Sequence, residues 1–292
     1  MKGEVLLIQK LIDASRKNIY QLDEYPIRDV EAQIQMELQE ILDLNQPEVL
    51  KDRLSYIGIG EESGYVNKWL KTNEGYVLAG IRHFGGNLDM PFVFMWPSFR
   101  IKNIERVVEE LTPTFSMFKP KYYNFWIRPD CNNYDVEIVQ QRFIGDINEM
   151  SKNNLRLIKP VEYYDWYENE YRKFHQLHPE FKYRIGCNDK SLMDESFAEG
   201  LLFLLTDDNE TIGLISGEKE IFLIKPSVYL NEILISNEHR GQGYGSKLLG
   251  SFVNQLEAKY FTCHIDIENI PSTQTAIKSG QKVFSQECFV FI

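Results

Sequence analysis

The sequence predicts a two-domain protein of the α/β (α+β) class, in which helices flank a mixed sheet. Its 292 residues are long for one domain and comfortable for two. Strand-like and helical apolar patterns alternate along the whole chain. A strand–helix–strand pattern occurs once in each half, over 91–129 and over 228–269. This echo suggests a diverged internal duplication, although mixed α/β chains also look alike at this coarse level.

The N-terminal half is predicted to begin with two helices and to continue with strands around a third helix. Apolar residues recur at helical spacing over 4–18, 29–43 and 101–118, and Pro113 is a candidate break in the last of these. Runs rich in β-branched and aromatic residues predict strands at 54–60, 75–84, 91–98, 121–129 and 136–145.

The polar, aperiodic segment 146–154 is the predicted boundary between a domain at 1–150 and a domain at 151–292. Helices are expected at 163–178, at 188–200 after Asn188 or Asp189 as N-cap, from the glycine-rich loop to about 260, and at 271–280. Strands are expected at 155–161, at 201–222 as a pair around a DDNE turn, and at 228–236, 261–269 and 282–292.

Charge and composition exclude several classes of protein. A formal net charge of −11 and an isoelectric point near 5.1 argue against nonspecific nucleic-acid binding. The four cysteines have no metal-binding spacing, which favours reduced thiols in a cytoplasmic protein without a metal. No stretch approaches the roughly 20 apolar residues of a membrane span. We therefore expect no nucleic-acid or membrane partner, and the oligomeric state is open.

The stretch RGQGYGS, residues 240–246, places three glycines between a strand and a helix. Such a turn can bind an anion, because free N–H groups at a helix start point outward and glycine leaves room for close approach. It is not a P-loop, since no Lys-Ser/Thr follows at the required spacing. It also fails the dinucleotide pattern GxGxxG, whose last position is Ser246.

Arg240, Gly243 and Gly245 match the R/Q-x-x-G-x-G/A signature of the GCN5-related N-acetyltransferases, the GNAT superfamily. Downstream, Asn269 and Ser272 match its N-x-x-S pattern, and Gly280 follows with Gln281 where Phe is usual. The element order from 155 to 292 also resembles the family. The resemblance implies a mixed, mostly antiparallel twisted sheet flanked by helices, here in tandem with a second α/β domain.

The resemblance also implies acetyl-coenzyme A as co-substrate, with no metal. Carried onto this chain, the N–H groups of Gln242, Gly243, Tyr244, Gly245 and Ser246 would cradle the pyrophosphate, with Gly241 assisting the turn and Arg240 adding charge. The backbone groups of Ile233 and Ile235 would hydrogen-bond the pantetheine, which would lie beside them like an additional strand. Asn269 and Ser272 would contact the pantetheine or phosphate arm.

Direct transfer needs a deprotonated amine, so a carboxylate on the central strand is the expected base. Glu232 is the first candidate, and a structural carboxylate is the competing interpretation. The family often has a Tyr four residues before the downstream Gly, which acts as the general acid, and this chain has Ala276 at that position. Tyr244 or Tyr229 would then protonate the thiolate, or no strong acid is needed. His175 and His178 are interpreted as packing or surface residues.

The predicted function is N-acetyl transfer to an amine of a small molecule or peptide. The alternative is a catalytically weak or inactive coenzyme A-binding protein with a regulatory or interaction role, and transfer of a longer acyl group is also open. The N-terminal half lacks the R/Q-x-x-G-x-G signature. If it is a degenerate GNAT-like domain, it would have no working cofactor site and would shape the acceptor cleft or bind a partner.

Overall fold

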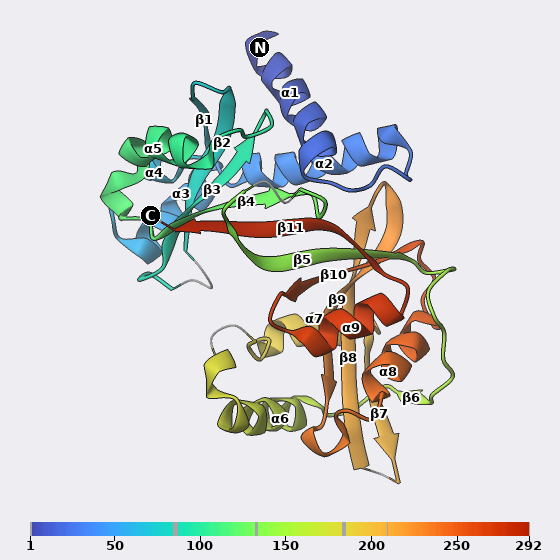
Figure 1. Cartoon of the computed structure of the whole chain (residues 1–292). Helices are drawn as coiled ribbons and strands as arrows, with labels where there is room; N and C mark the ends of the chain where they lie inside the picture. Colours follow the sequence, from blue (N-terminus) through green and yellow to red (C-terminus); the bar gives the residue numbers. More distant parts are fainter. Residues whose placement is uncertain (1, 84–86, 132–133, 183–184, 209, 292) are drawn as a thin grey trace. The chain divides into compact units, whose positions relative to one another are not determined.

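The computed structural model describes residues 2–83, 87–131, 134–182, 185–208 and 210–291 (Figure 1). The chain forms two compact units, called unit 1 and unit 2 below. Unit 1 comprises Met1–Val139 and Phe284–Ile292, and unit 2 comprises Gln140–Val283. The chain leaves unit 1 within strand β5 (Glu137–Asp146) and returns to it within strand β11 (Lys282–Phe291).

Unit 1 is a sheet with helices on its faces. The strands lie in the order β1-β2-β3-β4-β11, and only the pair β3–β4 is parallel. Its core lies between the sheet and helices α3 to α5, while Trp96 donates to Ser15 Oγ of α1 at 2.7 Å. Its helices are α1 (Lys2–Asn18), α2 (Ile27–Asp43), α3 (Pro47–Ile57), α4 (Glu62–Tyr65) and α5 (Ile104–Phe115), and its other strands are β1 (Lys68–Lys71), β2 (Tyr76–His83), β3 (Pro91–Pro97) and β4 (Tyr122–Ile127).

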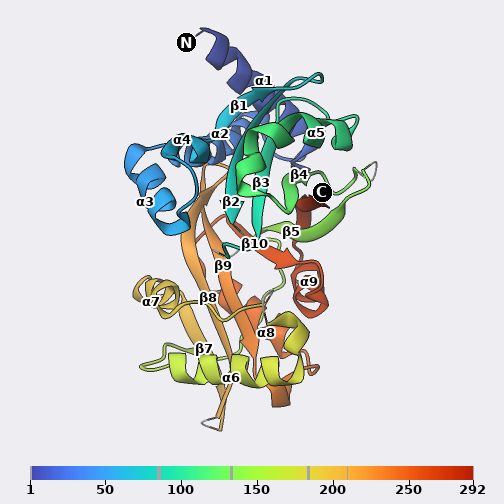
Figure 2. The same cartoon turned by 90° about the vertical axis from the view of Figure 1, so that its left-hand side faces the viewer.

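Unit 2 is a sheet covered on both faces, with strands in the order β5-β10-β9-β8-β7-β6 (Figure 2). Its helices are α6 (Tyr164–Leu177), α7 (Lys190–Ala198), α8 (Tyr244–Val253) and α9 (Ile270–Lys278), and its other strands are β6 (Leu157–Ile158), β7 (Leu202–Asp207), β8 (Glu210–Phe222), β9 (Lys225–Ile235) and β10 (Tyr260–Asp266). Alternation along β7 builds two cores. Phe203 and Leu205 pack toward α8, whereas Leu202 and Leu204 pack with α6 and α7.

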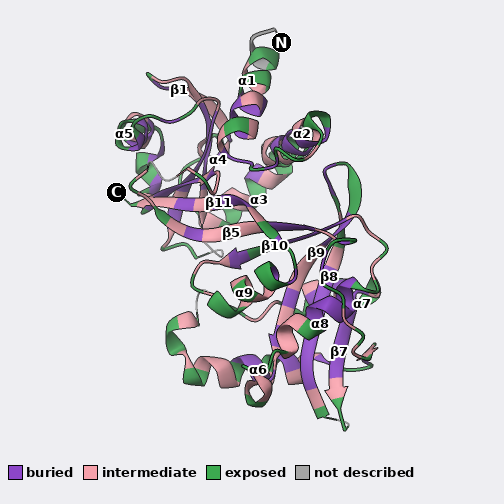
Figure 3. Ribbon diagram, turned by 45° about the vertical axis from the view of Figure 1, so that its right-hand side comes forward, coloured by how far each residue is buried: buried purple, intermediate pink, exposed green. Residues whose placement is uncertain are grey.

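The two cores of unit 2 hold the sheet at a fixed place between its helices. The buried side of α8 consists of Leu248, Leu249, Phe252 and Val253, and it appears in purple beside β7 and β8 in Figure 3. The opposite core contains Tyr167 and Tyr171 of α6 together with Leu234 of β9. Side chains of β9 that share a face with Leu234 therefore point toward α6.

The predicted strand at 54–60 is wrong, because residues 54–57 form the end of helix α3 and Gly58 caps it. Pro47 occupies the first helical turn, and Gly58 ends the helix in the left-handed conformation with φ of 71°. Leu50, Leu54 and Ile57 recur at helical spacing and pack into the core of unit 1. The apolar run is short enough to fit the spacing of either a strand or a helix, and tertiary packing selected the helix.

Most other predicted elements are present with shifted ends. Helix α5 continues through Pro113 to Phe115, and α8 ends at Val253, before the expected 260. Strand β1 and helix α4 were not predicted. The predicted ends at 84 and 292, and Asn209 of the DDNE turn, lie outside the described residues. No helix in the described part of the chain is long and apolar enough to span a membrane.

The polar segment predicted as the domain boundary is bonded into unit 2 along its length. Ile147 N donates to Lys259 O at 3.0 Å, and Ser151 N donates to Ser279 O at 2.9 Å. Ile147 and Met150 are buried in the core beneath α8. The division at 150/151 thus differs from the limits of the compact units, and the assignment of domains to 1–150 and 151–292 stays a prediction.

We expect Phe252→Ala to lower the free energy of unfolding by about 3–5 kcal/mol, because it empties the centre of the α8 core. Phe252 is fully buried between Phe203 and Phe261, at ring-centroid distances of 5.8 and 6.2 Å. Urea unfolding measures the loss. The control is Ile277→Ala on α9, where the side chain is 58% exposed and the change should stay within about 0.5 kcal/mol. Equal losses in the two variants would contradict the assignment of this core.

Candidate functional site

Strands β9 and β10 of unit 2 lie side by side for only a short distance. They pair in parallel over Ser227–Tyr229 and Tyr260–Thr262. Beyond this point β9 continues to Ile235 against β8, and β10 continues to Asp266 against β5. Among the described residues, the β10-facing edge of 230–235 pairs with no strand. An open strand edge of this kind can bind an extended chain through its backbone N–H and C=O groups.

A β-bulge lies where the two strands separate. Ser216 pairs with Glu232 and Gly217 pairs with Leu230, so Asn231 is an extra residue on β9. A bulge bends its strand and increases the local twist, and this bend accounts for the divergence of β9 from its parallel neighbour. Glu232 therefore lies at the start of the open edge.

The glycine-rich loop follows the end of β9 and leads into α8. Gly241 and Gly243 have φ of 74° and 80°, in the left-handed region that favours glycine, and both are exposed. A Cβ at either position would meet no atom within 4 Å. In the described structure, the N–H groups of 242–246 have no hydrogen-bond partner. The loop thus presents free donors and empty space at the positive end of a helix.

Arg240 fastens this loop to β9 and α6. Its Nε donates to Ile235 O at 3.0 Å, and its guanidinium carbon lies 4.8 Å from the centre of the Phe174 ring. Burial lowers the pKa of Arg240, and the Glu170 carboxylate opposes this shift. The side chain has a structural role in holding the loop, and its predicted contribution at the phosphates stays a prediction.

Glu232 is buried on the face of β9 that α6 covers, with 9% of its surface exposed. One carboxylate oxygen accepts hydrogen bonds from Tyr167 Oη at 2.6 Å and from Tyr171 Oη at 2.8 Å. Tyr167 Oη in turn accepts from Asn188 N at 2.8 Å. The two tyrosines are one helical turn apart, so both hydroxyls reach the same side of the strand.

The environment sets the protonation of this cluster. Burial raises the pKa of Glu232 above its ordinary value, while donors from Tyr167, Tyr171 and the N–H of Ile233 lower it in part. Burial, and next the charge of Glu232, raise the pKa of both tyrosines far above 10. The hydroxyls therefore remain donors, and the carboxyl is a stronger base than a solvated one.

The structure places the remaining candidates outside this cluster. The Tyr244 ring lies 5.9 Å from His239 and beside Lys247, and no hydrogen bond between Tyr244 and Glu232 occurs among the described residues. Asn269 caps α9, where its Oδ1 accepts from Ser272 N at 3.3 Å. Their predicted roles at the coenzyme stay predictions, as do those of Ile233 and Ile235 on the open edge.

Tyr229 and the two histidines of α6 differ in their surroundings. Burial raises the pKa of Tyr229, whose ring lies 5.4 Å from His264 where β9 and β10 separate. His175 Nε2 bonds to Ile185 O at 2.8 Å, and His178 lies against Phe174. The histidines thus pack locally, as expected. In the described part of the chain no cluster of three or more His, Cys, Asp or Glu side chains forms a metal site.

Sequence reasoning missed Tyr167 and Tyr171 as site residues and assigned them to the core. The one signal in the sequence is their spacing of four, on a helix that precedes the Glu232 strand. That spacing also fits ordinary packing, so only the contact between α6 and β9 shows that both hydroxyls bond to Glu232.

Residues 161–278 match the acetyltransferase (GNAT) family. This part of the chain is a GNAT-family acetyltransferase domain. It contains the open edge of β9, the glycine-rich loop and Glu232. The match confirms the resemblance expected from Arg240, Gly243 and Gly245.

Solved structures of the family resemble the chain at low identity. An acetyltransferase of the GNAT family from Colwellia psychrerythraea is 10% identical, with 77% of this chain and 84% of that chain covered and a TM-score of 0.46. A GCN5-related N-acetyltransferase from Sphaerobacter thermophilus is 10% identical, with 74% and 77% covered and a TM-score of 0.49. No curated protein matches the sequence significantly.

We expect Glu232→Gln to flatten part of the pH dependence of stability. Folding raises the pKa of Glu232 above its unfolded-state value near 4.5. The side chain therefore contributes its full stabilisation below that unfolded-state pKa, and the contribution is lost as the pH rises through the folded-state pKa. Urea unfolding across this range should show wild type losing stability relative to Glu232→Gln with rising pH. Glu162→Gln, at an exposed position, should follow wild type. Parallel curves for wild type and Glu232→Gln would contradict the raised pKa.

Proposed function

We propose that the GNAT domain binds acetyl-coenzyme A and transfers the acetyl group directly to an amine of a small molecule or peptide. The observation that carries this proposal is the open edge of β9 beside a glycine-rich helix start with free N–H groups. The edge suits a pantetheine amide chain, and the helix start suits a diphosphate. Both features belong to one strand–loop–helix segment, 225–253.

In the proposed reaction the amine nitrogen attacks the thioester carbon, so a C–N bond forms and the C–S bond breaks. Glu232 takes the proton of the amine, directly or through a water molecule, and the coenzyme leaves as a thiolate that takes up a proton. Tyr167 and Tyr171 hold the carboxylate and keep it from turning away. Tyr229, at the last paired position of β9 and β10, and Tyr244 are the two candidates for the acid that protonates the thiolate.

Unit 1 repeats the strand arrangement without the features of a cofactor site. Its strands β3 and β4 pair in parallel only over Phe92–Phe94 and Tyr122–Asn124. The connection to α5 has no glycine, and the Asn103 side chain caps the helix by accepting from Arg106 N at 2.7 Å. We propose that unit 1 is a degenerate GNAT-like unit that binds no coenzyme A.

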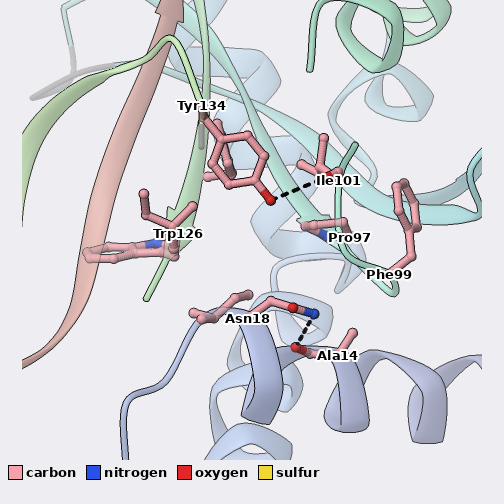
Figure 4. Close-up of a pocket in the computed structure, with 10 residues that line it drawn as sticks. Ala14, Asn18, Pro97, Phe99, Ile101, Trp126 and Tyr134 are labelled. Atoms are coloured by element: carbon pink, nitrogen blue, oxygen red, sulfur yellow. Dashed lines mark hydrogen bonds between the residues drawn. The ribbon is translucent and has the colours of Figure 1, made fainter. Parts of the chain in front are cut away.

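Side chains fill the part of unit 1 where β3 and β4 separate (Figure 4). The remaining cavity is about 10 Å³, roughly the room for one water molecule. Tyr134 donates across it to Ile101 O at 3.0 Å. The other lining residues come from α1 and the residue after it, from β4 and from the end of β3 with its following loop: Ala14, Asn18, Ile19, Pro97, Phe99, Phe125, Trp126 and Ile127. This cavity belongs to unit 1 and is no part of the Glu232 cluster.

We expect calorimetric titration to detect one acetyl-coenzyme A per chain, and Gly243→Ala to weaken that binding about tenfold or more. The new methyl group would strain a left-handed residue and occupy space reserved for the diphosphate. Gly58→Ala is the matched control, since Gly58 has φ of 71° and equally empty surroundings but ends α3 in unit 1. Two sites per chain, or equal weakening by both variants, would sink the proposed coenzyme site.

We expect Glu232→Gln to lower kcat/KM for amine acetylation about 100-fold or more, since general-base catalysis supplies about that much. The acceptor is found first by screening small amines, polyamines, aminoglycosides and peptide N-termini. In wild type the rate should fall as pH drops through the raised pKa of Glu232.

Tyr171→Phe tests the positioning of Glu232 by α6. Removing a donor to the carboxylate should move the acidic limb of the rate profile to higher pH. Tyr164→Phe is its control, because that hydroxyl donates to Asn188 O and not to Glu232. Full activity of Glu232→Gln would rule out its role as base, and coenzyme binding without turnover of any acceptor would instead favour a binding protein.

A further inference from the structure

Asn188, on the segment that leads into α7, contacts the Glu232 cluster in two ways. Its backbone N–H donates to Tyr167 Oη at 2.8 Å, and its side-chain Nδ2 donates to Asn231 O at 3.1 Å. Tyr167 bonds to Glu232, and Asn231 is the extra residue of the β9 bulge. One residue thus joins a hydroxyl that holds the candidate base to the bulge next to that base.

The N–H of Asn188 helps to decide where the Tyr167 hydrogen points. A tyrosine hydroxyl has one hydrogen and can donate only one hydrogen bond. Because the oxygen accepts from Asn188 N, its hydrogen is directed to Glu232 Oε2, with 2.6 Å between the two oxygens. Tyr171 donates to the same carboxylate oxygen at 2.8 Å. A shift of Asn188 would therefore disturb one of the two hydroxyl donors that hold the carboxylate.

The side chain of Asn188 holds that N–H in place. Its Nδ2 bonds to a carbonyl oxygen, which can only accept, so the orientation of the amide follows from its partner. The carbonyl belongs to Asn231, whose own Nδ2 donates to Ser196 Oγ of α7 at 3.1 Å. Ser196 is fully buried. The bulge is thereby bonded both to α7 and to the segment before it, and Asn188 links the bulge to the Tyr167 hydroxyl.

We propose that Asn188 is a positioning residue for the acetyl transfer and acts on Glu232 through the Tyr167 hydroxyl. The inference rests on the proposed function, in which Glu232 takes the proton of the amine. Asn188 keeps the carboxylate and the bulge in a fixed relation, so that the base stays at the start of the open edge of β9. Fixed geometry of a reacting group supports a high rate, and a small displacement lowers it. Asn188 itself exchanges no proton in the reaction.

Titratable groups face Glu232 from α6 and from the segment before α7. They are Tyr167 and Tyr171 on the helix and the Cys187 thiol next to Asn188. Burial raises the pKa of Cys187 above its ordinary value, so the thiol is uncharged near neutral pH. Burial also raises the pKa of Glu232, and the two tyrosine donors lower it in part. A weaker bond from Tyr167 should therefore raise the pKa of Glu232 further.

The first test compares Asn188→Ala with wild type in amine acetylation. We expect kcat to fall about 3- to 10-fold while KM for acetyl-coenzyme A stays within about twofold, because the variant disturbs the base and leaves the glycine-rich loop intact. The acidic limb of the rate profile should move to higher pH. Asn254→Ala is the control, since this exposed asparagine of the same unit donates its Nδ2 to Asn154 Oδ1 at 3.0 Å and should behave as wild type.

A double-mutant cycle shows whether Asn188 acts through Tyr167. In a Tyr167→Phe background the hydroxyl is absent, so Asn188→Ala should cause no further movement of the acidic limb. A merely structural role would produce the same change in both backgrounds. Asn188→Leu keeps the approximate size of the side chain and removes the donor, and it gives the same comparison if Asn188→Ala fails to fold.

Titration of Glu232 itself tests the link without turnover. Carbon-13 NMR of labelled glutamate carboxyl groups follows the titration, and the Glu232 signal is the one that is missing in Glu232→Gln. We expect a higher pKa of Glu232 in Asn188→Ala than in wild type and Asn254→Ala. An unchanged titration, or equal shifts of the acidic limb in both backgrounds, would overturn the proposal. The expected NMR shift in a wild-type protein that acetylates no amine would instead count against the proposed acetyl transfer and support the link from Asn188 to Glu232.

Discussion

The separation of β9 from β10 is the constraint on which the rest of unit 2 depends. Backbone groups inside a sheet must find partners, and among the described residues no strand other than β8 pairs with 230–235. The bulge at Asn231 lies where the two strands diverge, and a bulge bends its strand. An extended ligand backbone would complete this edge, which links the fold of the GNAT domain directly to its chemistry.

The Glu232 cluster couples a structural requirement to the proposed catalysis. A carboxyl buried this deeply needs donors, and α6 supplies them as two tyrosine hydroxyls. The same burial that destabilises the charged carboxylate also raises its pKa toward the values that suit a general base. Helix α6 therefore packs on the sheet and, in the proposed reaction, also sets the basicity of Glu232.

Unit 1 shows a different use of a similar strand arrangement. Where β3 and β4 separate, aromatic side chains fill the space, and Asn103 caps the helix that follows. Two of its buried polar atoms without a hydrogen-bond partner, Arg82 Nη2 and Asn67 Oδ1, lie beside Gly80 of β2.

The sequence by itself determined the order of most elements and the loop from Arg240 to Ser246, because apolar period and glycine placement act locally. It misjudged 54–60, where a short apolar run fits either period and the core of unit 1 selected the helix. Only the tertiary structure decided the partners of Glu232, the divergence of β9 from β10 and the bond from Asn188 to Asn231. Each of these contacts joins residues that are far apart in the sequence, and no local pattern predicts which strand a helix will cover.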